Sequence, residues 1–330
     1  MHQLPGNMPK WNGCEFIFDR DCRNYDWLVV YNEIPSPLGE RKGLRFEELA
    51  CPPEHTMLTT TEPSSIKIYG KAYTAQFGCV LTSQEEWALP HPDRIFSQPA
   101  LHWFYGIGAN QEISFDQMVA NPPVNKTRSL SMVYSSKKQW HTLHRKRFNF
   151  MQHMIEAFPG IDLYGRGAAP LNDKAEALDA YKYHISIENF IGEHHWTEKL
   201  ADPFLGLTLP FYCGCPNAAD YFPMDSFIPI DINKPEEAVR IITRAIQNNE
   251  YEKCLPSILK ARHLVLYEYN FFAVIAREIR KRHGPHRNPT TGKILYSRHA
   301  LRNRNLSTML NDVYDKARTR TIHVLKQYIR

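Results

Sequence analysis

The chain has 330 residues, of which 43% are hydrophobic and 12% aromatic, enough for about two folded domains and too apolar for a disordered chain. The formal net charge of +5 fits an anionic small molecule, a membrane surface or a nucleic acid, and does not choose among them. No apolar run approaches the ~18 residues of a transmembrane helix, and the N-terminus lacks the apolar run of a signal peptide. The seven cysteines show neither a C-x-x-C pair nor a zinc-type spacing, so we expect reduced thiols and a cytoplasmic protein.

The N-terminal part of the chain alternates apolar runs with polar connections. The runs at 27–31, 56–61 and 79–81 predict strands. The charged segment 40–50 predicts a helix, which two prolines then end. From 85 to 125 the chain is rich in Pro, His, Trp and Asn, which predicts a loop and a domain junction. Strands separated by helices favour a parallel α/β sheet.

A second α/β series begins near residue 127. The apolar patterns predict strands at 128–136, 161–165, 183–187, 208–213 and 226–232, and helices at 137–158, 174–182, 197–207 and 234–246. Pro159 and Gly160 end the first of these helices, while Asn233 and Pro235 are typical of a helix start.

Charged and hydrogen-bonding side chains gather where one of these strands meets the next helix. Glu188 and Asn189 end the strand, and Thr197, Glu198 and Lys199 open the helix. Ligands of open parallel sheets bind at the carboxyl ends of strands, and the free N–H groups of a helix start favour a phosphate. The chain contains neither a P-loop nor a G-x-G-x-x-G motif, which argues against a P-loop phosphotransferase. Its one D-x-D lies far upstream and only weakly supports a metal site.

The order and spacing of several motifs over about 130–245 resemble the α1,3/4-fucosyltransferase family. The matches are Tyr181-Lys182-Tyr183, Glu188-Asn189, Thr197-Glu198-Lys199, Thr208, Pro210, Gly214, Pro216, Tyr221 and Ser226-Phe227-Ile228. The upstream segment 147–167 is similar to the family's R-x-x-Y and Y-G-R stretch. Two positions depart from the pattern. His195 stands where the family usually has Tyr, and Phe190 stands where it has Ser or Thr.

The resemblance implies a GT-B architecture of the α/β class, with two Rossmann-like domains facing each other across a cleft. We expect an acceptor-binding domain at 1–125, a donor-binding domain at 126–275 and a basic helical tail at 276–330. The resemblance also implies inverting transfer from GDP-fucose without a metal ion or a cofactor, because cationic side chains stabilise the leaving diphosphate. The positions that match the family's donor-binding residues are Arg147, Glu188, Asn189, His195, Glu198 and Lys199. Among them Arg147 and Lys199 are the candidates for the diphosphate, and Glu188 is expected to orient the loop.

Inverting transfer further requires a carboxylate that takes the proton of the acceptor hydroxyl. The family places a glutamate after a strand in the N-terminal domain, in an E-x-P or E-S-P setting. Glu62, followed by Pro63, matches that setting. Glu85 and Glu86 follow another strand and are rivals, and Glu62 also fits a turn-capping residue.

Plainer interpretations stand beside several of these assignments. Arg147 lies in a basic run that also fits a solvated helix face. His194 and His195 are adjacent but lack a third ligand, so no metal site is predicted. Residues 277–330 hold 14 Lys and Arg against three acids. This tail fits a helix packed over the domains, a peripheral contact with anionic lipid at the inner face of the membrane, or nucleic acid, for which no motif is present.

The sequence therefore predicts a soluble, bacterial-type α1,3-fucosyltransferase. Its expected partners are a nucleotide-sugar donor and an oligosaccharide or glycolipid acceptor, with O3 of GlcNAc in a cell-surface glycan such as lipopolysaccharide as the accepting hydroxyl. One alternative keeps the fold and uses another GDP- or UDP-linked sugar. Another, from a different class, is a non-catalytic nucleotide- or glycan-binding relative.

Overall fold

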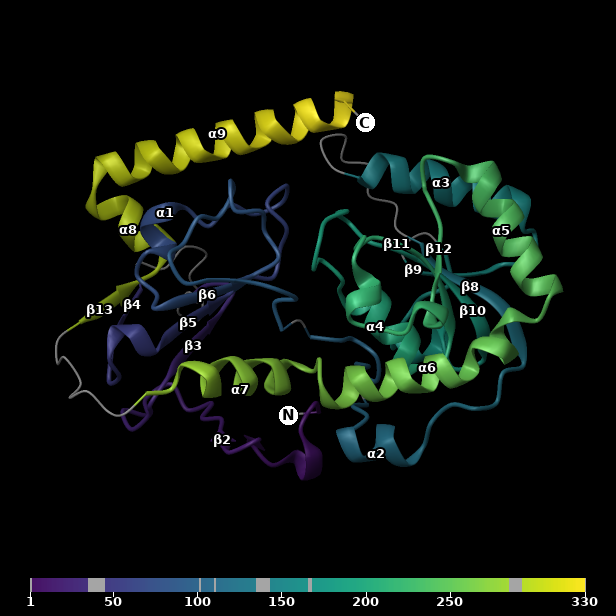
Figure 1. Cartoon of the computed structure of the whole chain (residues 1–330), viewed down its shortest axis with the longest axis horizontal. Coiled ribbons are helices and arrows are strands. Elements are labelled where there is room, and N and C mark those ends of the chain that lie inside the picture. Colours follow the sequence, from purple (N-terminus) through teal and green to yellow (C-terminus); the bar gives the residue numbers. More distant parts are fainter. Residues whose placement is uncertain are drawn as a thin grey trace. The chain divides into compact units, whose positions relative to one another are not determined.

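The computed structural model describes residues 2–34, 45–100, 102–109, 111–134, 143–165, 168–284 and 293–329 (Figure 1). Its contacts divide the chain into two units. The first unit comprises Met1–Cys14 and Leu101–Ile275, and the second comprises Glu15–Ala100 and Ala276–Arg330. Among the described residues no helix combines the length and the apolar character that a membrane span requires.

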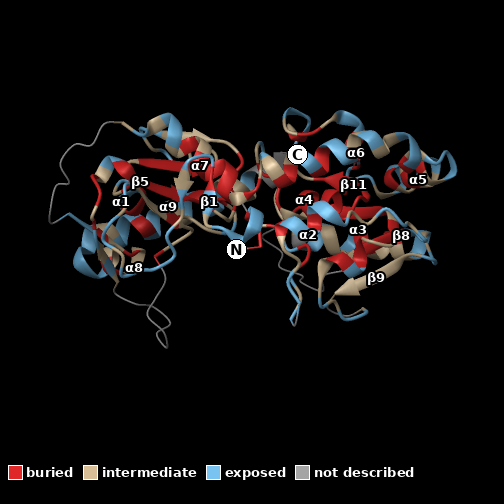
Figure 2. Ribbon diagram, turned by 90° about the horizontal axis from the view of Figure 1, so that it is seen from below, coloured by how far each residue is buried: buried red, intermediate tan, exposed pale blue. Residues whose placement is uncertain are grey.

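The first unit contains a five-stranded sheet in the order β12-β11-β10-β8-β9, and every pairing in it is parallel. Its strands are β8 (Arg128–Tyr134), β9 (Asp162–Gly165), β10 (Tyr181–Ile187), β11 (Leu209–Cys213) and β12 (Ile228–Pro229). The strands β10 and β11 are buried because both faces of the sheet are covered. Figure 2 accordingly shows β11 as buried along its length.

Helices cover this sheet and pack against one another. Those of the first unit are α2 (Phe115–Ala120), α3 (His144–Ala157), α4 (Glu198–Leu205), α5 (Pro235–Gln247) and α6 (Glu250–Tyr267). The helices α4 and α6 both contact β11, and α3 packs on α5. Pro235 occupies the first turn of α5, where its missing N–H costs no hydrogen bond.

The second unit is built on a smaller parallel sheet in the order β3-β5-β6-β7. Its strands are β3 (Leu28–Tyr31), β5 (Thr56–Thr59), β6 (Cys79–Thr82) and β7 (Arg94–Phe96). The core beneath it joins residues from both ends of the unit, among them Leu58, Tyr73, Val80 and Leu295. The prediction of an α/β protein with parallel sheets is confirmed. The predicted cleft between two facing domains stays a prediction.

The C-terminal segment is tied into the second unit. The strand β13 (Ile294–Tyr296) pairs antiparallel with β4 (Phe46–Glu48), and it is followed by α8 (Arg298–Arg304) and α9 (Leu306–Ile329). The remaining elements are α1 (Lys71–Thr74), α7 (Phe271–Arg282) and the short pair of β1 (Lys10–Trp11) with β2 (Cys14–Glu15). Residues 285–292 of the expected tail lie outside the described residues.

The unit boundaries and the expected domain boundaries coincide at 275/276 and differ at 125/126. The first unit already includes 101–125, because α2 packs there through Phe115, whose ring lies edge-on to that of Tyr267 with centroids 5.3 Å apart. The first 14 residues also join this unit, since Gly6 N–H donates to Asp116 on α2 at 2.8 Å.

Several expected elements differ in the structure. The helix expected at 40–50 is wrong where the structure describes it, because residues 46–48 form β4, which pairs with a strand far along the sequence. The helix expected at 174–182 is a short 3₁₀ turn that gives way to β10. The segment 85–125 contains β7 and α2, although α2 carries a readable start signal, the capping box of Ser114 and Gln117. The strand expected at 226–232 shortens to Ile228–Pro229 at the sheet edge, and the end of that expected at 128–136 lies outside the described residues.

Candidate active site

A pocket of about 260 Å³ opens in the first unit where β10 meets the start of α4. Four charged side chains line it, Arg147, Lys174, Glu198 and Lys199. The other lining residues are Val133, Leu178, His184, Ile185, Ser186, Ile187, Asn189 and Pro203. The structure thus brings together four of the six donor-site residues expected from the sequence. Glu188 and His195 lie just behind this lining.

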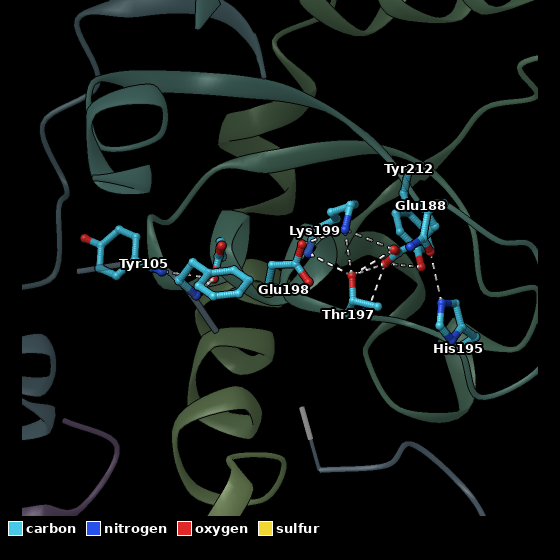
Figure 3. A network of polar contacts seen from close by, with 10 residues as sticks. Tyr105, Glu188, His195, Thr197, Glu198, Lys199 and Tyr212 are labelled. Atoms are coloured by element: carbon cyan, nitrogen blue, oxygen red, sulfur yellow. Dashed lines mark hydrogen bonds and ion pairs between the residues drawn. The ribbon is translucent and has the colours of Figure 1, made fainter. Parts of the chain in front are cut away.

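Glu188 is fully buried and holds the start of α4 in place (Figure 3). Its Oε1 accepts from Thr197 N–H at 2.8 Å, and its Oε2 accepts from the Thr197 hydroxyl at 2.8 Å. The Tyr212 hydroxyl adds a longer contact of 3.4 Å. Burial raises the pKa of Glu188, while the nearby Lys199 opposes the rise. Because its oxygens are engaged inside the protein, Glu188 is placed to hold the start of α4, and its expected role in orienting the loop stays a prediction.

Lys199 forms an ion pair in the first turn of α4 (Figure 3). Its Nζ lies 2.5 Å from Glu198 Oε1 and 3.8 Å from Glu188 Oε2. Burial alone would lower the pKa of Lys199, but Glu198 and Glu188 outweigh it and raise that pKa. Burial alone would likewise raise the pKa of Glu198, but Lys199 and Lys174 outweigh it and lower that pKa. Both groups therefore stay charged, and the Lys199 side chain keeps 23% of its surface exposed at the pocket.

Arg147 and Lys174 line the same pocket. Unlike Lys199, neither forms an ion pair within the described part of the chain. The buried Arg147 Nε has no hydrogen-bond partner there. Burial lowers the pKa of Arg147, and the charges of Glu188 and Glu198 counteract that loss. Two cations are thus directed at the pocket without a carboxylate bound to either.

Asn189 and His195 form the next layer of the site. His195 Nε2 lies 3.3 Å from Asn189 Oδ1, and its ring meets Phe190 edge-on with centroids 5.4 Å apart. Burial lowers the pKa of His195 to about 3, so its ring is neutral at physiological pH. His195 is therefore placed to fix the Asn189 amide, which itself lines the pocket.

Gly214 explains why the turn after β11 approaches this site so closely. A Cβ built on Gly214 would lie 2.4 Å from Glu188 Cγ and 2.4 Å from the Tyr212 hydroxyl oxygen. Only glycine fits there without moving the buried carboxylate. The glycine of the G-x-P turn, which the sequence singled out, thus has a packing reason within the site.

Glu62 lies in the second unit, three residues after the end of β5, and is half-buried. Its carbonyl oxygen accepts from Gln84 Nε2 at 2.7 Å, and its charge acts on Lys67. The rival Glu85 is engaged by Ser64, whose hydroxyl donates to Oε2 at 2.6 Å, while Glu86 is exposed. The carboxyl ends of β5 and β6 therefore hold Glu62 and its rival together.

The sequence reasoning missed three polar residues of the pocket, Lys174, His184 and Ser186. Lys174 belongs to a segment whose apolar pattern predicted a helix, so nothing marked it as a ligand-facing residue. A usable signal existed for His184 and Ser186. Both alternate with the buried Ile185 and Ile187, and so they share the face of β10 that ends in Glu188.

The part of the chain that contains the pocket is similar to known proteins. Residues 124–253 match the family model described as glycosyltransferase family 10 (fucosyltransferase), C-terminal part. The mouse 4-galactosyl-N-acetylglucosaminide 3-alpha-L-fucosyltransferase 9 is 32% identical over 119 residues, which cover 34% of this chain and 32% of the mouse protein. A chimpanzee 3-galactosyl-N-acetylglucosaminide 4-alpha-L-fucosyltransferase is 28% identical over 130 residues, covering 37% of this chain and 34% of that protein. The matched region thus spans about a third of these relatives.

Two solved structures described as α1,3-fucosyltransferases are also similar to this chain. One has 17% identity and a TM-score of 0.44 and covers 81% of this chain and 82% of that one. Another, described as a complex with GDP-fucose, has 19% identity and a TM-score of 0.38 and covers 80% and 77%. The family resemblance expected from the motifs is confirmed by the family model and the curated relatives, and the pocket lies inside the matched segment.

Proposed function

We propose that this chain, which carries the C-terminal part of glycosyltransferase family 10 at residues 124–253, transfers L-fucose from GDP-fucose to a glycan hydroxyl. The observation that carries the proposal is the pocket in that segment, where Arg147 and Lys174 have no ion pair within the described residues and lie beside Lys199. A donor diphosphate supplies the anion that these cations need. Family 10 relatives named as fucosyltransferases support fucose as the sugar.

In the proposed reaction the cations act on the leaving group. The acceptor oxygen bonds to the sugar C1 as the bond from C1 to the phosphate oxygen breaks, and the configuration inverts. Negative charge then grows on the diphosphate, and Arg147, Lys174 and Lys199 stabilise it more strongly than they stabilise the intact donor. Positive side chains thereby do the work that a metal ion does elsewhere, so the proposed reaction uses no metal.

Glu62 is the proposed general base. It takes the proton of the acceptor hydroxyl as that oxygen attacks C1, which balances the charge that leaves with GDP. Its place beyond the carboxyl end of β5 is the edge at which ligands of open parallel sheets bind. Glu85 directly follows Gln84, whose side-chain amide donates to the Glu62 carbonyl oxygen. Glu85 is not needed in this scheme because the Ser64 hydroxyl donates to its carboxylate.

The proposed acceptor is O3 of GlcNAc in a cell-surface glycan such as lipopolysaccharide. Its support is the names of the curated relatives, which describe transfer to O3 or O4 of an N-acetylglucosaminide. We also propose a cytoplasmic location with a peripheral membrane contact through the basic tail, supported by the charge of residues 277–330. These parts of the proposal need their own tests with glycolipid acceptors and anionic vesicles.

The first test is nucleotide binding. Thermal shift and calorimetry with GDP, UDP, CMP and ADP, followed by GDP-fucose, measure which ligand the folded chain selects. The proposal expects stabilisation by GDP and tighter binding of GDP-fucose. Selective binding of UDP would replace the donor and keep the alternative of a different nucleotide sugar. Binding without release of fucose to any acceptor would favour the non-catalytic alternative.

A matched pair of variants assigns the binding to the pocket. Lys199→Met should weaken GDP binding roughly 10- to 100-fold, because one charge-assisted contact with phosphate is lost. Lys182→Met is the control, since Lys182 lies at the start of β10, does not line the pocket and pairs with Glu252. Equal affinities of the two variants would overturn the phosphate assignment.

A further inference from the structure

Two polar side chains of the pocket are used neither by the diphosphate nor by the ion pairs. His184 and Ser186 line the pocket from β10. Residues two apart on a strand point to the same face, so both lie on the face that ends in Glu188. Their chemistry differs from that of the cations around them, because each can take part in a neutral hydrogen bond.

The proton of His184 can be placed from its neighbours. The Ser131 hydroxyl donates its single proton to the Ala177 carbonyl oxygen at 2.6 Å. The His184 Nδ1 lies 2.8 Å from the same hydroxyl oxygen, which must therefore accept, so Nδ1 carries the hydrogen. In a neutral imidazole Nε2 is then an acceptor. Burial lowers the pKa of His184 to about 3, with a smaller contribution from Lys174, which keeps the ring neutral.

Neither group forms its remaining hydrogen bond with any residue that the structure describes. His184 Nε2 has no partner within the residues that the structure describes. The Ser186 hydroxyl is buried and also has none there. A buried hydroxyl without a partner is destabilising, so its place in a pocket wall points to a bound ligand that completes it.

A phosphate cannot satisfy His184. At neutral pH the phosphate oxygens of a nucleotide diphosphate are acceptors without hydrogens, and Nε2 is an acceptor as well. The group that fits Nε2 is a donor, and a sugar hydroxyl offers both a donor and an acceptor. Arg147, Lys174 and Lys199 are donors that line the same pocket, but none of them donates to Nε2 within the residues that the structure describes.

We infer that His184 and Ser186 form the part of the donor pocket that recognises hydroxyl groups: His184 Nε2 accepts from one sugar hydroxyl, and Ser186 bonds with a neighbouring one. This inference rests on the proposed function, since it divides the donor between cations for its diphosphate and β10 for a ring that carries hydroxyls. That ring is either the ribose or the transferred sugar, and the test separates the two.

Ser186→Ala is the decisive variant because its two effects have opposite signs. The folded protein loses an unpaired buried hydroxyl, so the melting temperature without ligand stays the same or rises by about 1 to 4 °C. The affinity for GDP-fucose falls by about 3- to 10-fold, the effect of one neutral hydrogen bond. A purely structural role would lower the melting temperature and leave affinity unchanged.

Ser226→Ala is the matched control in the same unit. Its hydroxyl is also buried, but it donates to the Pro223 carbonyl oxygen at 2.7 Å and does not line the pocket. The control should lower the melting temperature and bind GDP-fucose with unchanged affinity. His184→Asn supplies a second variant, because the Asn amide can still donate to Ser131 while the acceptor at the Nε2 position is lost. His184→Asn should weaken the binding of GDP-fucose by a similar factor.

Calorimetry with three probes separates the sources of the hydroxyl. If the ribose is bound, both variants weaken GDP as much as GDP-fucose, and wild type prefers GDP to 2′-deoxy-GDP. If the transferred sugar is bound, the variants weaken only GDP-fucose. Wild-type affinities retained by both variants for all three probes would overturn this inference alone. Failure of the wild type to bind GDP-fucose would overturn the proposed function, and this assignment with it.

Discussion

Asp202→Asn tests whether burial controls a carboxyl group next to the candidate site. Asp202 lies on α4 with only 1% of its surface exposed. Its Oδ1 accepts from the backbone N–H of Phe104 at 3.0 Å and of Tyr105 at 3.2 Å. Its Oδ2 has no partner in the described part of the chain. Asn keeps the accepting oxygen and replaces the unpaired one by an amide nitrogen, so it resembles the protonated acid.

The magnitude follows from the pKa of Asp202. Burial, with help from Glu198 and against Lys174, raises that pKa from 3.8 to about 7. Because the folded state binds the proton more tightly, this group contributes its full stability below about pH 4 and loses it as the pH rises to about 7. At ~1.36 kcal/mol per pKa unit the loss is about 4 kcal/mol. Asn does not titrate and loses nothing.

The assay is urea unfolding at two pH values, followed by the fluorescence of the buried Trp103 and Trp196. Between about pH 5 and pH 8 the stability of Asp202→Asn relative to wild type should increase by about 2 to 3 kcal/mol. Asp225→Asn, at an exposed position, is the control and should show no such trend. If Asp202→Asn is instead less stable by the same amount at both pH values, the charged carboxylate holds the two N–H groups and the burial argument is refuted.

Three further variants test the support of the pocket and the base. Glu188→Ala should cost about 3 to 5 kcal/mol in urea unfolding, since Thr197 loses the acceptor of its N–H and hydroxyl; a loss below about 1 kcal/mol would contradict that anchor. Gly214→Ala should lower the free energy of unfolding by about 1 to 3 kcal/mol, because the new Cβ meets Glu188. It should also weaken the binding of GDP, and wild-type GDP affinity in calorimetry would show that this turn does not support the site. Glu62→Gln should reduce turnover of GDP-fucose about 10²- to 10⁴-fold with GDP affinity unchanged, and normal turnover would transfer the role of base to Glu85.

The local patterns predicted the parallel strands well because each depends on its own residues. The segment 183–187 carries a strand pattern of its own, is buried on both faces and forms part of β10. The strand β4 could not be predicted in this way. Its residues 46–48 are charged and suit a helix, but they pair with Ile294–Tyr296, and tertiary pairing overrides local preference. The start of α2 could have been predicted, because Ser114 begins a capping box, but the segment was assigned to a loop.

The candidate site was predictable to the extent that its residues belong to contiguous motifs. Glu188, Glu198 and Lys199 share one strand-to-helix junction, so one motif located all three. Lys174 lines the pocket from a 3₁₀ turn that contacts β8, a strand about 40 residues away in the sequence, and no local pattern predicts that contact. The difference between Glu188 and Glu198 also needed the structure. One carboxylate is enclosed by Thr197, and the other is paired at the pocket wall.

The pairing pattern explains why the proposed anion pocket contains carboxylates at all. Two acids beside the proposed phosphate site weaken its attraction for the ligand, yet Glu198 and Glu188 fix Lys199 and keep it charged. A cation held in place before the ligand arrives needs no rearrangement when charge develops on the leaving group. Arg147 and Lys174, which form no ion pair within the described residues, then supply the net positive charge. In the proposed function Lys199 thus contributes a fixed position as well as affinity, and the other two cations add affinity. Replacing Arg147 or Lys174 should therefore weaken GDP and GDP-fucose alike, whereas replacing Glu198 should reduce turnover more than binding.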